Sequence, residues 1–288
     1  SGTPRCFCIF CWIVRAVTQL AFVAYVLVAA VRHAASEVET GSLHALCPFG
    51  AVESLWSLVV GGRFLPKIHA SSAVLAVGLF AGALVVGGAF CGWICPLGAL
   101  GDLMAWVRRK LRIKEVVVPP RLDAVLRYGR YVVLAVIMIA TVSTATLWFA
   151  AYDPYYVIFR LGPIFEPNLA TDWPGYLIAL GVIGGSLLIP RVWCRYLCPL
   201  GGLLGLVQRI SPFKIRRDAA VCIDCKRCDK VCPARLDVST ARAVTHDCSM
   251  CLRCVAECPA PGALEAALPG YEGKSEARSA KTDRAQEA

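Results

Sequence analysis

The sequence predicts a mainly α-helical membrane protein, in which a bundle of four transmembrane helices is followed by a small cysteine-rich α+β module. Three observations predict this class. Hydrophobic residues make up 57% of the 288 residues and charged residues only 17%, a balance too apolar for a soluble domain of this length. Four apolar runs are long enough to cross a bilayer, which takes about 20 helical residues. Of the 16 cysteines, twelve fall in four compact clusters that each end in Cys-Pro.

The four apolar runs define a membrane domain that we expect over residues 12–217. They lie at about 12–31, 68–90, 128–149 and 174–192. The connections after the second and fourth runs are rich in Arg and Lys, whereas the connection at about 150–173 carries Asp153, Glu166 and Asp172 against one arginine. Since basic connections stay in the cytoplasm, we expect a multi-pass protein of a prokaryotic inner (cytoplasmic) membrane, with both termini cytoplasmic. The net charge of +10 arises mainly from basic residues that lie beside the apolar runs. We therefore expect contact with membrane lipid and none with nucleic acid.

The two ends of the chain differ in composition from the membrane domain. Residues 1–11 form a short cytoplasmic N-terminus with Cys6, Cys8 and Cys11, to which we assign no ligand. No small-residue cleavage site follows the first apolar run, so we expect a retained helix and not a signal peptide. Residues 267–288 are mostly small and polar, a composition that cannot bury a core and predicts a disordered tail.

Two four-cysteine motifs stand in the expected module, residues 218–266. Both read C-x2-C-x2-C-x3-C-P, a spacing that wraps three thiolates around one cubane while the fourth cysteine reaches the other. Zinc sites usually pair two C-x2-C knuckles over a longer gap, so zinc is disfavoured. The motifs resemble those of bacterial two-cluster ferredoxins. They predict two [4Fe–4S] clusters, the first held by Cys222, Cys225, Cys228 and Cys258 and the second by Cys248, Cys251, Cys254 and Cys232.

The other two clusters form an internal repeat within the membrane domain. "CGWICPLGALGDL" begins at residue 91 and "CRYLCPLGGLLGL" at residue 194, and both follow an apolar run. Proline favours the first position of a helix. We therefore expect Cys95 and Cys198 at the N-caps of short amphipathic helices, at about 96–109 and 199–210, along the cytoplasmic face. The positive end of a helix dipole favours a thiolate there.

The repeat brings four thiolates to one membrane depth, namely Cys91, Cys95, Cys194 and Cys198. If the repeated halves pack face to face, these residues would hold a third iron–sulfur cluster or a soft metal such as Cu(I). A redox-active thiol pair and simply packed cysteines remain alternatives. A partial copy, "CPFGAVESL", begins at Cys47. The charge pattern places Cys47 outside the membrane unless this stretch folds back as a re-entrant helix.

The helices, the paired C-x3-C-P motifs and the trailing two-cluster motif together resemble the membrane polyferredoxin family. That family includes NapH-type quinol dehydrogenase subunits, the C-terminal half of NosR-type regulators and CcoG-type assembly proteins. The resemblance covers about residues 12–260. It implies a membrane-bound iron–sulfur protein that passes electrons between the quinone pool, or a membrane partner, and other subunits of a redox complex.

Other residues offer further hypotheses. A quinol site needs an apolar cleft and a proton acceptor, for which Glu53 and Asp153 are available, although "AAYDPYYVIF" around Asp153 also fits an interfacial aromatic belt. The four histidines are His33, His44, His69 and His246; His33 and His69 would serve one outer haem or lie solvated at the interface.

We find no substrate-transforming motif, so the chain is expected to act as the electron-transfer subunit of an oxidoreductase complex. A copper-handling assembly factor or a redox-sensing regulator is the alternative.

Overall fold

The computed structural model describes most of the chain. The described residues are 3–35, 48–62, 70–144, 146, 149, 152–159, 169–244 and 246–268. Helices predominate among them, and the remaining secondary structure is one small sheet near the C-terminus. Cys47, His44 and His69 lie outside the described residues, as does the predicted polar tail beyond residue 268.

Four long helices correspond to the four apolar runs. They are α1 (Thr3–Ala35), α3 (Ala70–Val86), α6 (Pro120–Thr144) and α9 (Leu169–Leu188). Two of them are long and apolar enough to cross a membrane, at Trp12–Arg32 and Pro120–Thr144, and the apolar parts of α3 and α9 are shorter. These helices indicate membrane association, while a complete four-helix bundle stays a prediction.

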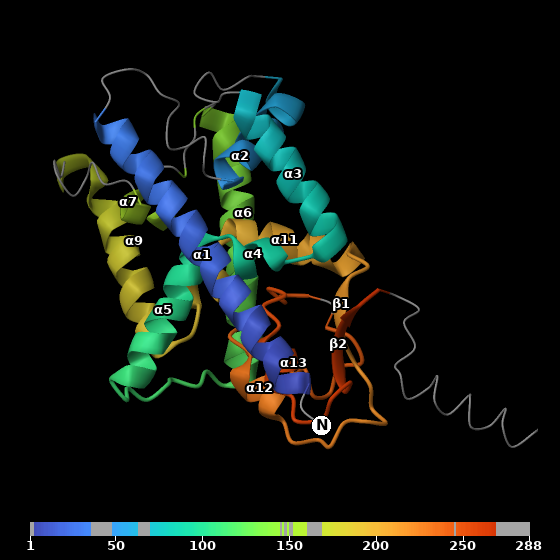
Figure 1. Cartoon of the computed structure of the whole chain (residues 1–288). Helices are drawn as coiled ribbons and strands as arrows, with labels where there is room; N and C mark the ends of the chain where they lie inside the picture. Colours follow the sequence, from blue (N-terminus) through green and yellow to red (C-terminus); the bar gives the residue numbers. More distant parts are fainter. Residues whose placement is uncertain are drawn as a thin grey trace, which may run out of the picture.

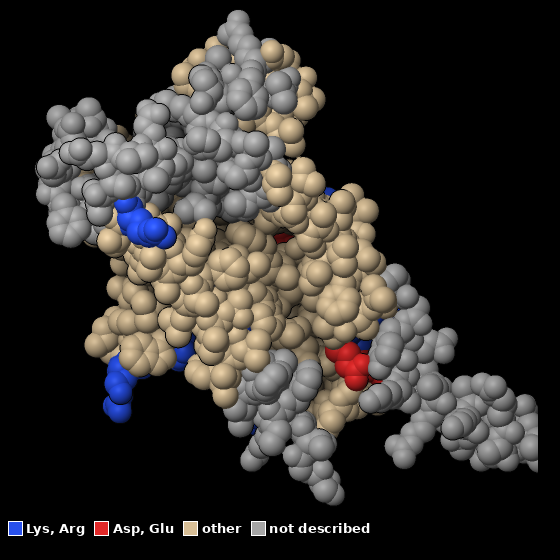
Figure 2. Space-filling model, turned by 45° about the horizontal axis from the view of Figure 1, so that its top comes forward, with Lys and Arg blue, Asp and Glu red and all other residues tan. Residues whose placement is uncertain are grey.

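The outer faces of the long helices are apolar and exposed. Leu20 of α1, Val74 of α3, Ile139 of α6 and Leu180 of α9 each leave about 70% of their surface uncovered. In Figure 2 one face of the molecule is a broad tan surface, and the visible charged residues lie mostly near its edges. A helix in the core of a soluble protein would be buried, so these faces are suited to contact with lipid chains.

Two predicted runs end earlier than their hydropathy indicates. The run expected to 90 breaks at Gly87, whose φ of +63° ends α3 before the next helix begins at Ala89. The run expected to 192 ends at Leu188, and Arg191 then adopts a left-handed φ of 51°. Glycine tolerates that conformation without a Cβ clash, and proline at 190 cannot continue a helix.

Each break opens into a pair of short helices that carries one C-x3-C-P motif. The pairs are α4 (Ala89–Trp93) with α5 (Pro96–Lys110), and α10 (Val192–Tyr196) with α11 (Pro199–Ile210). The predicted helices at 96–109 and 199–210 are therefore present, and Cys95 and Cys198 occupy their N-caps with proline next in the chain. In Figure 1, α4 and α11 lie in the middle of the molecule, between the long helices and the cysteine-rich module.

Two further helices complete the side away from the module. They are α2 (Pro48–Gly61), which packs against α3 and α6, and α7 (Pro154–Phe159), which packs against α9. Buried apolar side chains of the long and short helices form one core, which includes Phe49, Ile137, Trp193 and Leu204.

The cysteine-rich module is a small α+β unit at the N-terminal end of α1 (Figure 1). Its sheet pairs β1 (Lys214–Arg217) antiparallel with β2 (Leu264–Ala267), so it begins before residue 218. Between the strands lie α12 (Arg227–Val231) and α13 (Arg253–Ala256). Ile215, Met250 and Leu264 contribute to a second core, separate from that of the membrane domain.

Candidate functional site

The two motifs of the module share one backbone geometry. In each, the residues on both sides of the second cysteine have positive φ, and none of them is glycine: Asp224, Lys226, Met250 and Leu252. Such angles are uncommon for these residue types and persist only where the surrounding structure fixes them. The same turn made twice wraps each cysteine run around a centre of its own.

One of these centres is a pocket, which we call the outer module site. It is lined by Cys222, Cys225, Cys228 and Cys258, the set expected to hold the first cluster. Cys225 is exposed, whereas Cys228 is buried. Arg217 also lines the pocket, and its buried Nε has no hydrogen-bond partner among the described residues. An unpaired buried donor is costly, so this nitrogen points to an acceptor such as thiolate or sulfide sulfur.

The other four module cysteines gather at what we call the inner module site. Cys254 lies close enough to Cys251, Cys248 and Cys232 for their charges to interact. Most of this site is covered, with Cys254 8% exposed. Cys232 therefore meets the second motif and Cys258 the first, which is the crossed arrangement expected from the spacing.

The chemistry of these donors favours a cluster over a single ion. In the part of the chain that the structure describes, no three His, Cys, Asp or Glu side chains come together as a group able to hold one metal ion. A tetrahedral zinc site would bring four sulfurs to about 3.8 Å of one another, given zinc–sulfur bonds of about 2.3 Å. A cubane takes one thiolate on each iron and spreads the sulfurs further apart. The C-x2-C-x2-C-x3-C-P spacing of the module cysteines is typical of this second arrangement.

The C-x3-C-P cysteines line a single pocket, which we call the membrane-domain site. Its cysteines are Cys91, Cys95, Cys194 and Cys198 together with Cys248 of the module. The two repeat halves, more than ninety residues apart in the chain, thus meet around one space. Gly201 donates its backbone N–H to Cys198 Sγ over 3.3 Å, as the helix N-terminus allows. Because Cys248 also belongs to the inner module site, the two sites adjoin.

Positive charge and spare hydrogen-bond donors surround the membrane-domain site. Four arginines line it: Arg127, Arg130, Arg191 and Arg195. Arg130 Nε, Arg195 Nε and Gln208 Nε2 are buried there without a partner among the described residues. A buried donor left unpaired costs about 1–3 kcal/mol, and more when it is charged. A thiolate–metal cluster, being anionic and rich in acceptor sulfur, would satisfy these groups.

The module is pressed against the membrane domain at a glycine seam. A Cβ added to Gly88 would lie 2.3 Å from the carbonyl oxygen of Cys248, and one added to Gly92 would lie 2.1 Å from that of Ser249. Trp93 Nε1 donates to the carbonyl of Met250 over 2.9 Å. The second cysteine motif therefore rests directly on α4, beside Cys91.

Asp102 of α5 ties three parts of the molecule together. It pairs with Arg15 of α1, with Arg191 at 2.8 Å and with Arg253 of the module at 3.2 Å. Burial opposes ionisation of this carboxyl, but Arg191, Arg15 and Arg253 outweigh it and lower its pKa to about 2. Asp247 of the module similarly pairs with Arg127 and Arg130 of α6.

The remaining sequence candidates are not among the residues that line the three cysteine sites. Asp153 lines a separate apolar pocket, one wall of which is formed by Cys95 and Cys198. His246 lines an open groove beside α6, which shares Arg127 and Arg195 with the membrane-domain site. Cys6, Cys8, Cys11 and His33 belong to α1, but their side chains are not among those described.

Comparison with known proteins agrees with this geometry. Residues 68–114 and 171–218, which contain the two C-x3-C-P motifs, match the family described as 4Fe-4S binding domain. Residues 214–259 match the 4Fe-4S dicluster domain. NapH and NosR proteins are among the relatives, at 30% and 31% identity. The chain belongs to the NapH/NosR-type polyferredoxin family.

Three relatives illustrate the family. The putative electron transport protein YccM of Escherichia coli is 37% identical over 234 residues, which is 79% of this chain and 64% of YccM. MauN of Methylobacillus flagellatus, a methylamine utilization ferredoxin-type protein, is 30% identical over 73% of this chain and 71% of MauN. NapH of Haemophilus influenzae, a ferredoxin-type protein, is 30% identical over 59% of this chain and 58% of NapH. The chain thus spans less than two thirds of YccM and of NapH. No solved structure matches it.

The structure shows residues around the membrane-domain site that the cysteine motifs do not predict. In the sequence, Arg191 and Arg195 indicate only the orientation of the chain, whereas in the structure both line the membrane-domain site. Gln208 is a further example, because it is 1% exposed within an otherwise apolar helix. A lone amide on the buried face of an amphipathic helix is the signal that would have identified it.

Proposed function

We propose that this polyferredoxin is a membrane electron-transfer protein with three iron–sulfur clusters in series. The outer module site, the inner module site and the membrane-domain site would each hold one [4Fe–4S] cluster. Such clusters, when bound, take up and release single electrons.

The observation that carries this proposal is the position of Cys248. This residue belongs to the second ferredoxin motif and also lines the pocket of the four C-x3-C-P cysteines. Cys232 lies with the second motif and Cys258 with the first, so crossed ligation would link the two module sites. The inner module site therefore adjoins the membrane-domain site, and the crossed motifs join it to the outer module site, so electrons could pass along the three sites in this order.

The residues around the membrane-domain site are suited to stabilise a bound anionic cluster. Arg130 and Arg195 offer buried cationic donors, and Gln208 offers a neutral one. In a low-dielectric interior these groups act strongly on a bound anion, since little water screens them. They would raise the reduction potential of that site relative to one enclosed only by apolar side chains.

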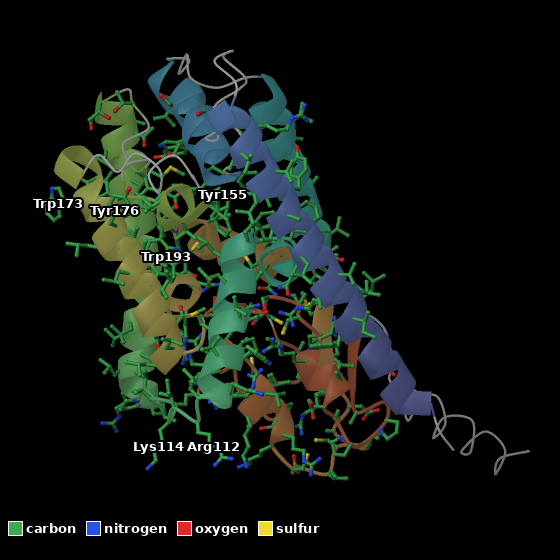
Figure 3. The ribbon with its side chains drawn as sticks, turned by 60° about the vertical axis from the view of Figure 1, so that its left-hand side comes forward. Arg112, Lys114, Tyr155, Trp173, Tyr176 and Trp193 are labelled. Carbon is green, nitrogen blue, oxygen red and sulfur yellow. The ribbon has the colours of Figure 1, made fainter. Side chains whose placement is uncertain are left out.

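The proposed orientation follows from the two ends of the molecule. Arg112 and Lys114 lie at the lower end in Figure 3, the end of the module, while Trp173 and Tyr176 lie near the opposite end of α9. Basic residues mark the cytoplasmic side and aromatic residues the interfaces. We place α1, α3, α6 and α9 across the bilayer, with the module and both termini in the cytoplasm of a prokaryotic cell.

We place the two ends of the electron path at opposite ends of the cluster series. The membrane-domain site is the end nearest the bilayer, where a quinone of the membrane pool would exchange electrons. Cys225 is exposed at the outer module site, which is therefore the end open to a partner redox subunit. The names of the relatives, which include electron transport and ferredoxin-type proteins, support such a role.

Metal analysis of the protein purified without oxygen tests the proposal. We expect about twelve irons and about twelve acid-labile sulfides for each chain, four of each per cluster. About eight irons with bound copper would instead favour a copper-handling factor. About eight irons without copper would leave the four membrane-domain cysteines as thiols, and a series of three clusters would be excluded.

A further inference from the structure

A cavity of about 150 Å³ lies next to the membrane-domain site, on the side away from the module. We call it the apolar pocket. Its walls carry aromatic side chains from several helices: Phe22, Tyr25, Phe49, Phe90, Phe149 and Trp193. A cavity of this size with apolar walls is large enough for one six-membered ring. In Figure 3 Tyr155 and Trp193, which both line it, lie in the upper and middle part of the molecule, far from Arg112 and Lys114.

The pocket opens toward the surface that we assign to lipid. Phe22 and Tyr25 stand on α1, and they are 39% and 60% exposed. The opposite walls are buried, with Trp193 7% exposed. A flat apolar molecule dissolved in the bilayer can therefore enter past α1 without crossing water.

Electrons and protons would leave this pocket through different residues. Cys95 and Cys198 line both the apolar pocket and the membrane-domain site, so the two spaces share a wall. Asp153 also lines the pocket, where it is the one Asp, Glu, Lys or Arg among the described residues. Asp153 is 8% exposed, and its Oδ1 accepts the backbone N–H of Tyr155 over 2.9 Å, which begins α7.

A second buried acid lies near Asp153. Glu53 of α2 is 2% exposed, and Thr141 donates its hydroxyl to Glu53 Oε1 over 2.8 Å. Glu53 also accepts a hydrogen bond from the backbone of Phe149, a residue of the pocket wall, and its charge interacts with that of Asp153. Acids buried in this way are expensive and mark pathways for protons or ions.

The geometry points to the apolar pocket as a quinol-oxidation site in which Asp153 is the catalytic proton acceptor and Glu53 receives the proton from it. This inference rests on the proposed function, because it needs an iron–sulfur group at Cys95 and Cys198 as the one-electron oxidant. Oxidation breaks the two O–H bonds of the quinol and leaves a quinone. The two protons pass in turn to Asp153 and on to Glu53, and the two electrons leave one at a time through the shared wall.

Asp153→Asn is the informative variant, because asparagine keeps the volume and the helix-capping ability of the side chain but cannot accept the proton as a carboxylate does. The anaerobic full-length protein is mixed with duroquinol, and bleaching of the iron–sulfur absorbance is followed by stopped flow. We expect a rate about 100-fold lower than in the wild type, in the range of a lost general base. Asp153→Glu should recover part of the rate.

Two matched variants separate the acids from general effects of substitution in α2. Glu53→Gln should slow bleaching by about 10-fold, less than the loss at Asp153, because Glu53 does not touch the quinol. Ser54→Ala should leave the rate unchanged, since the Ser54 hydroxyl only donates to the carbonyl of Gly50 in its own helix. Bleaching by dithionite, which needs no quinol site, should be the same in every variant.

A binding measurement supplies a readout that does not depend on the clusters. A short-chain azidoquinone is photolysed with the protein, and labelled peptides are mapped by mass spectrometry. We expect labels in the segments around Phe22–Tyr25 and Tyr155, lost with excess decylubiquinone and retained in Asp153→Asn. Labels confined to other segments, or wild-type rates in Asp153→Asn, overturn the inference. If dithionite bleaches the wild type but duroquinol does not, the inference is also overturned, while the proposed clusters stand. If neither reductant bleaches the wild type, the result counts against the clusters themselves.

Discussion

The cysteines of the module and those of the membrane domain are assembled in different ways. In the module, eight cysteines lie within two short runs, and repeated left-handed turns at residues such as Lys226 and Leu252 shape each run. In the membrane domain, four cysteines come from two helix pairs and meet only because α11 packs on α6 and α3, and α5 packs on α9. The first arrangement is local and the second depends on the whole fold.

The two regions therefore depend on different contacts in order to form. The module has a core of its own around Ile215 and Met250, so its sites depend mainly on nearby chain. The membrane-domain site depends on long-range contacts and on the module itself, because Cys248 closes one side of it. Substitutions at the seam should therefore disturb the membrane-domain site more than the outer module site.

The largest effect is expected at the glycine seam. Gly92→Ala places a Cβ against the carbonyl oxygen of Ser249, and a backbone atom cannot move aside as a flexible side chain does. We expect a loss of about 3 kcal/mol in stability, measured by thermal unfolding in detergent, with weaker electron transfer into the module. Gly78→Ala is the matched control, since nothing lies within 4 Å of its added Cβ. Equal unfolding temperatures for the two variants would show that the module does not press on α4.

Features that depend on local sequence could be predicted, whereas features that depend on contacts between distant parts of the chain could not. The motif spacing predicts the crossed meeting of Cys258 with the first motif, because the fourth cysteine of this spacing reaches the other cluster. The N-caps at Cys95 and Cys198 follow from proline at the next position. The seam does not follow, because a glycine in an apolar run looks the same whether it faces lipid or another backbone.

Hydropathy likewise predicts where apolar helices lie but not where they end. The break at Gly87 lies against the side chain of Gln208 in α11, and the turn at Arg191 accompanies its ion pair with Asp102; both partners lie far away in the chain. The places of the four arginines and Gln208 do not follow from the sequence either, since they line a pocket formed by both repeats.

The second largest effect is expected at Asp102. Asp102→Asn removes the charge that holds Arg15, Arg191 and Arg253, and should cost about 2 kcal/mol, which is what a carboxyl pKa lowered from 3.8 to about 2 contributes. A lowered pKa means that this contribution is complete above about pH 4 and fades only as the pH falls toward 2. The difference between variant and wild type in thermal unfolding should therefore be constant from pH 6 to 8. A difference that changes across this range would contradict the assignment.

A smaller effect is expected at Trp93. Trp93→Phe keeps most of the apolar surface but removes the hydrogen bond to the carbonyl of Met250, worth about 1 kcal/mol. The exchange rate of amide hydrogens in peptides around Cys248–Leu252 should rise. Peptides around Cys222–Cys228 serve as the internal control and should be unchanged, because the outer module site lies away from the seam.

An effect as small as that at Trp93 is expected at Gln208. Gln208→Leu removes a buried N–H donor from the membrane-domain site, and loss of a donor to sulfur disfavours the more negative, reduced state. We expect the midpoint potential of that site to fall by about 40 mV, the one-electron equivalent of about 1 kcal/mol. Gln19→Leu is the control, because Gln19 is also buried but donates to the carbonyl of Gly92 and does not line the site. Redox titration followed by EPR would detect the difference, and equal shifts in both variants would rule out a donor role for Gln208.

The most direct test of three clusters in one chain is the iron content of a double variant. Cys91→Ser with Cys194→Ser removes one thiolate from each repeat and leaves all eight module cysteines in place. Purified without oxygen beside the wild type, the variant should hold about eight irons against about twelve, with the module's EPR signals retained. The same iron content in both proteins would mean that the C-x3-C-P cysteines hold no cluster.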